Sequence, residues 1–169
     1  MLVRLMISAL VAGASLWSTI ALAQATATAT VKDTAGKTVG AAILRETPNG
    51  TLVALRFRGL PPGTHAFHVH AVGKCDPPFK SAGGHYNPGG IKHGILMEGG
   101  PHAGDMPNIH VAKNGKLDIE ILNTRLKLDG RLFDADGAAL ILHAKGDDYR
   151  SQPSGAAGAR IACGVIIKK

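Results

Sequence analysis

The chain has 169 residues, enough for one domain with a substantial core, and its formal net charge is +7. This positive balance does not indicate nucleic-acid binding, because no run of Lys and Arg exceeds two residues and aromatic residues make up only 4% of the chain. Stacking platforms for bases are therefore scarce. A small anionic substrate fits the charge better.

Residues 1–23 have the pattern of a secretory signal peptide. Arg4 supplies a positive start, residues 5–22 form an apolar run, and Ala-Leu-Ala at 21–23 forms a cleavage site. We therefore expect this segment to be removed, which leaves residues 24–169 as a single exported domain with no membrane attachment. The alternative is an uncleaved membrane anchor, since the apolar run is nearly long enough to span a bilayer.

Eight stretches bounded by turn residues are alternately or continuously apolar, and we predict each to be a β-strand. They are residues 26–31, 37–44, 51–57, 65–72, 109–112, 117–122, 138–143 and 160–167. A short further piece is expected at 126–128, and Asn49-Gly50 predicts a hairpin turn. No stretch has a convincing helical period. We predict an all-β fold, a Greek-key β-sandwich or barrel that is immunoglobulin-like, with about eight strands and two long functional loops.

Histidines are concentrated in one segment, which holds five of the eight in the sequence. Its candidate ligands are His68, His70, His85, His93, His102 and Asp105. Imidazoles with one carboxylate form a donor set typical of zinc and copper rather than calcium or magnesium. Residues 73–108 contain nine Gly and five Pro, and so long a loop is expected to be functional or tied down, as metal binding would do. The alternative is a mobile surface loop, which gives no reason for the histidines.

Predicted strands carry three of the candidate histidines. His68 and His70 are two residues apart on a predicted strand, so they share one face while Phe67 and Val69 point to the other. A polar outer strand face is the alternative. His143 ends another predicted strand and either joins the first cluster or is a core or edge histidine.

The segment after residue 23 has two cysteines, Cys75 in the histidine-rich loop and Cys163 in the last apolar stretch. Export permits a disulfide. It would link the loop covalently to a core strand and add up to about 4 kcal/mol to the free energy of unfolding in the chain-entropy model. Two free thiols or metal ligands remain the alternative.

Six short motifs resemble copper–zinc superoxide dismutase of the exported bacterial type. They read H-A-F-H-V-H, S-A-G-G-H-Y-N-P, K-H-G, P-H-A-G-D-M-P-N, L-H-A-K-G-D-D and G-A-R-I-A-C-G-V. The resemblance covers essentially all of residues 24–169. It implies a periplasmic enzyme, found in this family as a monomer or a homodimer. Its implied reaction disproportionates superoxide to oxygen and hydrogen peroxide, with copper alternating between Cu(II) and Cu(I).

The resemblance also implies roles for individual residues. Copper would be bound by His68, His70, His85 and His143. Zinc would be bound by His85, His93, His102 and Asp105, with His85 bridging both metals as an imidazolate. Asp147 would link a copper histidine to a zinc histidine, Arg160 would line the anion channel, and Cys75 and Cys163 would form the disulfide. His65 and His110 would be structural. Without the resemblance, Asp147 is interpreted as a solvated loop charge and Arg160 as an ion-pair partner.

Three alanines depart from the family pattern. Ala66 replaces a frequent glycine, Ala71 an acidic or amide residue, and Ala156 a common asparagine, and none of these changes removes a ligand. Two rival functions remain at this stage: a periplasmic copper- or zinc-binding protein without turnover, and an inactive β-sandwich used for adhesion. Loss of ligands would favour the second rival, but all seven candidate ligands are present.

Overall fold

The computed structural model describes residues 24–169, and the predicted signal peptide lies outside them. Ten strands and one 3-10 turn, η1 (Lys80–Ala82), make up the regular structure of this part. The strands are β1 (Thr26–Asp33), β2 (Thr38–Thr47), β3 (Gly50–Phe57), β4 (Gly63–His65), β5 (Phe67–His70), β6 (Ile109–Val111), β7 (Leu117–Asn123), β8 (Ala139–His143), β9 (Arg160–Val165) and β10 (Ile167–Lys168). Among the described residues no helix is long and apolar enough to cross a membrane.

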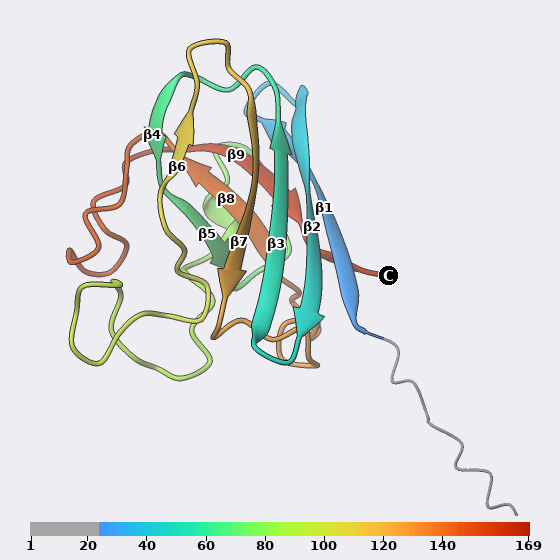
Figure 1. Ribbon diagram of the computed structural model, residues 1–169, viewed down its shortest axis with the longest axis vertical. Helices are drawn as coiled ribbons and strands as arrows, with labels where there is room; N and C mark the ends of the chain where they lie inside the picture. The colour runs from blue at the N-terminus through green and yellow to red at the C-terminus, as the bar shows by residue number, and fades with distance from the viewer. Residues whose placement is uncertain (1–23) are drawn as a thin grey trace, which may run out of the picture.

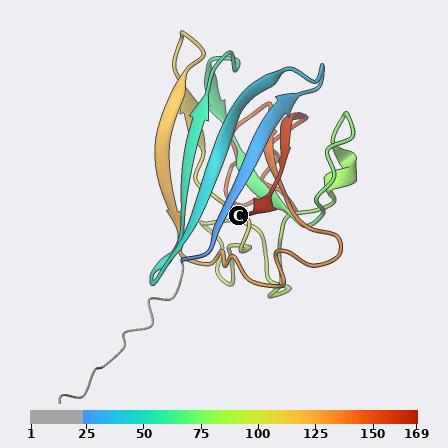
Figure 2. The ribbon, with the colours of Figure 1, turned by 90° about the vertical axis from the view of Figure 1, so that its right-hand side faces the viewer.

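All strand pairs are antiparallel, and the main sheet has the order β5-β8-β9-β1-β2-β3-β7, with β10 pairing with β1. A separate two-stranded ladder joins β4 to β6. The sheet curls so that β1, β2, β3 and β7 form one layer and β5, β8 and β9 cross behind it (Figures 1 and 2). The predicted all-β fold is confirmed. Ala66 separates β4 from β5 and Ile166 separates β9 from β10, so the ten strands correspond to the eight predicted ones.

The main core lies between the two layers, and period-two alternation decides which side chains reach it. Leu55 and Phe57 of β3 and Phe67 and Val69 of β5 are fully buried in this core. A second, smaller cluster lies on the opposite face of β8 and β9, where Phe79 and Ala82 cover Ile141 and Cys163. This outer cluster anchors the start of the long loop against the sheet.

One local expectation was wrong, and another was displaced by one residue. Residues 126–128 form no strand, although Leu126 and Leu128 are buried. The Leu126 carbonyl accepts a hydrogen bond from Thr51 Oγ1 at 2.8 Å. A side chain therefore supplies the hydrogen bond that a neighbouring strand would otherwise supply. The predicted hairpin is confirmed between β2 and β3, but its turn residues are 48 and 49 instead of Asn49-Gly50, since Gly50 already pairs with Thr47.

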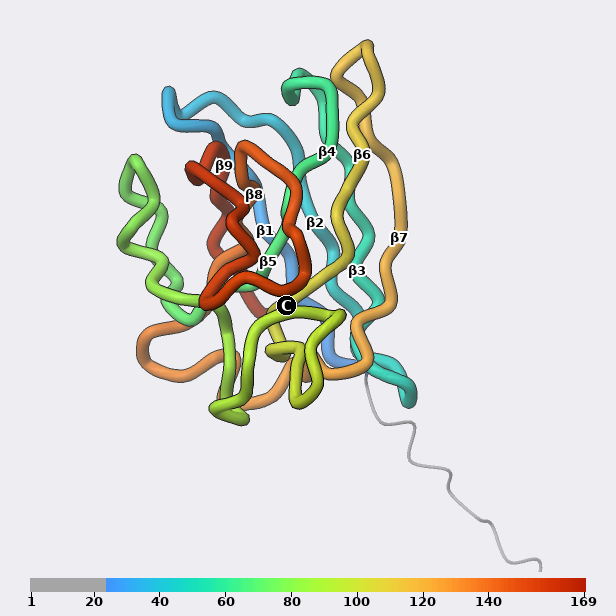
Figure 3. Tube along the Cα trace, turned by 90° about the vertical axis from the view of Figure 1, so that its left-hand side faces the viewer, coloured from blue at the N-terminus to red at the C-terminus, as the bar shows by residue number. Residues whose placement is uncertain are grey.

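Two long loops, residues 73–108 and 144–159, lie next to each other on one side of the molecule (Figure 3). The first loop runs back along β5, where His85 forms an isolated β-bridge with His70 and Asp105 forms one with His68. The second loop leaves β8 at His143 and returns to β9 at Arg160. Both loops therefore meet at the face of β5 and β8 that points away from the core.

Candidate metal centre

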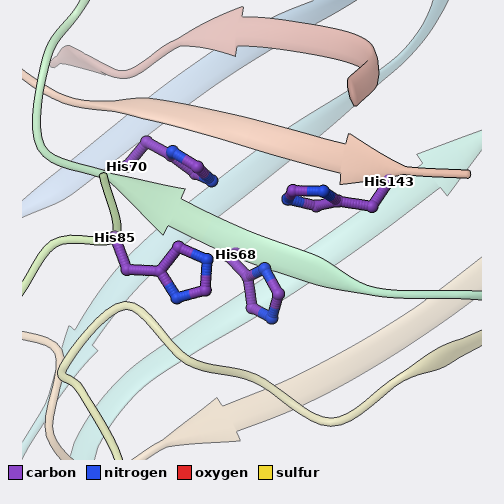
Figure 4. Close-up of side chains that lie close together, drawn as sticks. All are labelled: His68, His70, His85 and His143. Atoms are coloured by element: carbon purple, nitrogen blue, oxygen red, sulfur yellow. The ribbon is translucent and has the colours of Figure 1, made fainter. Parts of the chain in front are cut away.

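Four imidazoles converge on the outward face of β5. His68 and His70 come from this strand, His143 from the end of the neighbouring β8, and His85 from the first loop (Figure 4). One potential ligand atom from each lies within 4.8 Å of the others, and all four residues are buried. The ring centroids of His68 and His85 are 4.1 Å apart. This set is called the first group below.

A second group consists of His85, His93, His102 and Asp105, whose ligand atoms again lie within 4.8 Å of one another. Asp105 stands at its centre, with Oδ1 2.7 Å from His85 Nδ1 and Oδ2 2.9 Å from His93 Nδ1. His102 Nδ1 lies 3.3 Å from Asp105 Oδ1. His85 belongs to both groups. Its Nδ1 faces Asp105, which leaves Nε2 for the first group.

Ring nitrogens without a hydrogen-bond partner indicate that these groups fit metal ions. Within residues 24–169, five buried nitrogens form no hydrogen bond of good geometry, although the fourth is in ion-pair contact with Asp105: His68 Nδ1, His70 Nε2, His85 Nε2, His93 Nδ1 and His143 Nε2. In His70 the other nitrogen, Nδ1, donates to the Gly83 carbonyl at 2.9 Å, which fixes the ring. Leaving such a polar atom buried and unpaired costs about 1–3 kcal/mol. A cation held by the free lone pairs removes that cost, and nitrogen with carboxylate oxygen suits copper and zinc.

Burial keeps three imidazoles of the first group neutral, those of His68, His70 and His143. Loss of water contact lowers the pKa of His68 to about 4, of His70 to about 2 and of His143 to about 3. The positive charge of Arg160 further disfavours protonation of His70 and His143. At neutral pH these imidazoles therefore have free lone pairs, the form that binds a metal.

The second group is electrostatically different because it contains a buried carboxylate. Burial alone would lower the pKa of His93, but Asp105 and Asp147 face its two ring nitrogens and raise that pKa to about 9. Burial would raise the pKa of Asp105, yet the facing imidazoles of His85 and His93 hold it well below its usual range. Before metal binding, His93 is thus an imidazolium between two carboxylates.

Asp147 connects the two groups. Its Oδ2 lies 2.8 Å from His68 Nε2 and its Oδ1 lies 3.2 Å from His93 Nε2. The side chain of Asn108 holds the main chain of Asp147, accepting from its N–H at 2.7 Å and donating to its carbonyl at 2.9 Å. This function of Asn108 was not predicted from the sequence, although the residue ends the motif P-H-A-G-D-M-P-N. The spacing of 39 residues carries no local signal of the contact.

Arg160 stands at the mouth of the second loop and is partly exposed. Its guanidinium donates to the carbonyls of Phe79 and Gly83, both at 2.6 Å. Gly83 also accepts from His70 Nδ1, so Arg160 is fixed beside the first group. The disulfide Cys75–Cys163 is confirmed, with 5.7 Å between its Cα atoms, and it ties the same stretch of loop to β9.

The two remaining histidines of the described chain take no part in either group. Both ring nitrogens of His65 lie near main-chain oxygens, at 2.8 Å from that of Pro61 and 2.9 Å from that of His143. His110 is exposed on β6, where its Nδ1 lies 3.0 Å from Thr64 Oγ1. Their positions agree with structural functions.

Comparison with known proteins identifies the family. The family model described as copper/zinc superoxide dismutase matches residues 38–166. The chain belongs to this family. Superoxide dismutase [Cu-Zn] 2 of Aquifex aeolicus is 50% identical over 140 residues, which cover 79% of this chain and 82% of that protein. Superoxide dismutase [Cu-Zn] of Caulobacter vibrioides is 45% identical over 147 residues, covering 83% and 84%. A solved superoxide dismutase-like protein from Bacillus subtilis has a TM-score of 0.78 at 36% identity, covering 82% of this chain and 96% of its own.

The structure explains one departure from the copper/zinc superoxide dismutase pattern and gives the cost of another. Ala66 is fully buried, and its main chain pairs with Lys145 and His143, so a small side chain fits there. Ala156 has φ = 51°, a left-handed conformation that Asn adopts more readily than Ala. Alanine at this position therefore carries backbone strain of about 1 kcal/mol. Nothing in the structure explains Ala71.

Proposed function

We propose that this chain disproportionates superoxide to oxygen and hydrogen peroxide at a copper ion joined through His85 to a zinc ion. The observation that carries the proposal is the pair of buried four-donor groups that share one imidazole. Two four-coordinate ions need eight donors, and seven side chains supply eight only when one of them bridges.

The donor chemistry favours copper in the first group and zinc in the second. The first group, His68, His70, His85 and His143, consists of imidazoles alone, a set that suits copper. The second adds the carboxylate of Asp105 to three imidazoles, a combination common at four-coordinate zinc sites. When bound, copper supplies one-electron redox chemistry, and zinc, which has no redox chemistry, holds its ligands in place.

Two side chains of this chain act on the substrate and its protons. Arg160 keeps its charge at any working pH, and its two main-chain hydrogen bonds hold it beside the first group, where it attracts and orients the superoxide anion. His85 would hold a proton at Nε2 whenever that nitrogen is free and would give it to the peroxide product, whose second proton would come from water. Asp105, close to Nδ1 of the same ring, fixes its orientation.

The proposal is tested on purified protein by metal analysis combined with a superoxide-decay assay, before chelation, after chelation and after each metal is returned. We expect about one copper and one zinc per chain, loss of activity on chelation, and recovery that requires copper. A protein that binds both metals but leaves superoxide decay unchanged would instead be a copper- and zinc-binding protein without turnover.

Export to the periplasm is the remaining part of the proposal. It is supported by the signal-like pattern of residues 1–23 and by the disulfide, which persists in oxidising compartments. Cell fractionation with N-terminal sequencing tests it. A periplasmic protein that begins at Gln24 is the expected result, and a cytoplasmic protein that begins at Met1 would contradict it.

A further inference from the structure

The carboxamide of Gln152 pairs with both main-chain groups of His93. The N–H of His93 donates to Gln152 Oε1 at 3.0 Å, and Gln152 Nε2 donates to the His93 carbonyl at 2.8 Å. A third hydrogen bond, from Gln152 Nε2 to the Arg150 carbonyl at 3.0 Å, holds the carboxamide in place. One side chain from the second loop thus binds the backbone of a buried histidine in the first loop.

The same loop also contacts the imidazole of His93. Asp147 Oδ1 lies 3.2 Å from its Nε2, as described above. Gly155 packs so closely that a Cβ there would collide with the Asp147 carboxylate and approach His93 Nε2 to 2.8 Å. Residues 147–155 therefore fold over His93 and hold both its side chain and its main chain.

His93 needs this support because it lacks the backbone pairing that fixes most other candidate ligands. His68, His70 and His143 belong to strands, and His85 and Asp105 each form a β-bridge with β5. His93 lies in the Gly-rich part of the first loop, outside every ladder of the described chain. Gln152 hydrogen-bonds to the N–H and the C=O of His93, as the backbone of a neighbouring strand would.

We propose that Gln152 is a positioning residue for the second group, setting the place of His93 and hence the retention and geometry of the ion bound there. This inference rests on the proposed function, in which that group holds zinc. Partners that orient metal ligands typically change metal affinity by about 10–100-fold when they are mutated. Among the described residues the side chain of Gln152 hydrogen-bonds only to His93 and Arg150 and to none of the copper ligands, so the effect is expected on zinc.

Two substitutions and one control isolate the contact. Gln152→Ala removes all three hydrogen bonds, whereas Gln152→Glu keeps the acceptor for the His93 N–H and places a second oxygen opposite the His93 carbonyl. Ser154→Ala is the matched control, since Ser154 lies in the same loop and its side chain forms no hydrogen bond with the described residues. Gln152 is itself exposed, so neither substitution disturbs the core.

The experiment uses the copper- and zinc-loaded protein and measures the rate of zinc release to an excess of chelator. It also records the visible spectrum after Co(II) replaces zinc. We expect both Gln152 variants to release zinc about 10–100-fold faster and to show an altered Co(II) spectrum, with copper content and the copper spectrum unchanged. Ser154→Ala should match the unaltered protein in every measurement.

The possible failures are distinguishable. Zinc release and a Co(II) spectrum identical to those of the unaltered protein would overturn the function assigned to Gln152, as would equal loss of copper and zinc, which indicates general loosening. If the unaltered protein binds neither zinc nor Co(II), the proposed function itself fails, and the inference about Gln152 fails with it.

Discussion

Zinc binding to the metal-free protein should release about one proton at pH 7.5, and His93 is its source. The two facing carboxylates raise the pKa of His93 to about 9. A group with that pKa is about 97% protonated at pH 7.5. Nδ1 lies 2.9 Å from Asp105 Oδ2 and is the nitrogen available for zinc, so the ion must displace its proton.

The pH dependence follows from the same shift. The pKa of His93 in the folded protein lies above its ordinary value of 6.5, so protonation contributes stability to the metal-free protein below pH 6.5, and this contribution is lost as the pH rises through about 9. Zinc competes with that proton. Its apparent affinity should therefore fall about tenfold, or ~1.4 kcal/mol, for each pH unit below 9. Between pH 8.5 and 6.5 the change is about 100-fold.

Isothermal titration calorimetry in buffers of different ionisation enthalpy measures the number of protons released. The control is Asp147→Asn, which removes one of the two carboxylates that raise the pKa of His93 and should reduce the release at pH 7.5. Copper added alone should displace no proton from His68, His70 or His143, because burial lowers the pKa of each to between about 2 and about 4. Zinc binding without proton release, and with the same affinity at pH 6.5 and 8.5, would refute the reasoning.

Three further predictions concern separate parts of the site. Arg160→Ala should slow superoxide turnover severalfold or more and weaken its dependence on ionic strength while both metals stay bound; an unchanged rate in a stopped-flow assay would contradict the docking function. His143→Ala should lose copper and keep zinc, as judged by metal analysis, because His143 belongs to the first group alone. Replacing Cys75 and Cys163 by Ser opens a link between residues 88 apart and should lower the free energy of unfolding by ~4 kcal/mol. Denaturant unfolding measures this loss, and a change below 1 kcal/mol would contradict the stabilising effect of the disulfide.

The strands could be predicted from the sequence because their signals are local. Alternation in residues 65–72 correctly placed Phe67 and Val69 in the core and His68 and His70 on the other face. The segment 126–128 shows the limit of such signals. Its leucines are buried, but whether a buried segment is a strand depends on the hydrogen-bond partner of its backbone. Here that partner is Thr51, 75 residues away from Leu126.

The supporting contacts of the site could not be predicted for the same reason. Asn108 and Asp147 are 39 residues apart, and His93 and Gln152 are 59 apart. Each contact joins one irregular loop to the other, so neither side chain has a periodic pattern that assigns it a face. The resemblance indicated the link through Asp147, but only the folded arrangement shows that Asn108 and Gln152 hold the main chains of Asp147 and His93.

His143 shows how much one long-range fact adds to local rules. Along β8, Leu140 and Leu142 point into the main core, so Ile141 and His143 point outward. In the β5–β8 ladder Ile141 lies directly opposite His68, and directly opposed residues of an antiparallel pair share a face. His143 therefore faces the same side as His68 and His70. Alternation along β8 shows only that His143 is on the face opposite Leu142. The conclusion that His143 joins the first group also requires that β5 and β8 are neighbours, and no local pattern in either strand predicts that pairing.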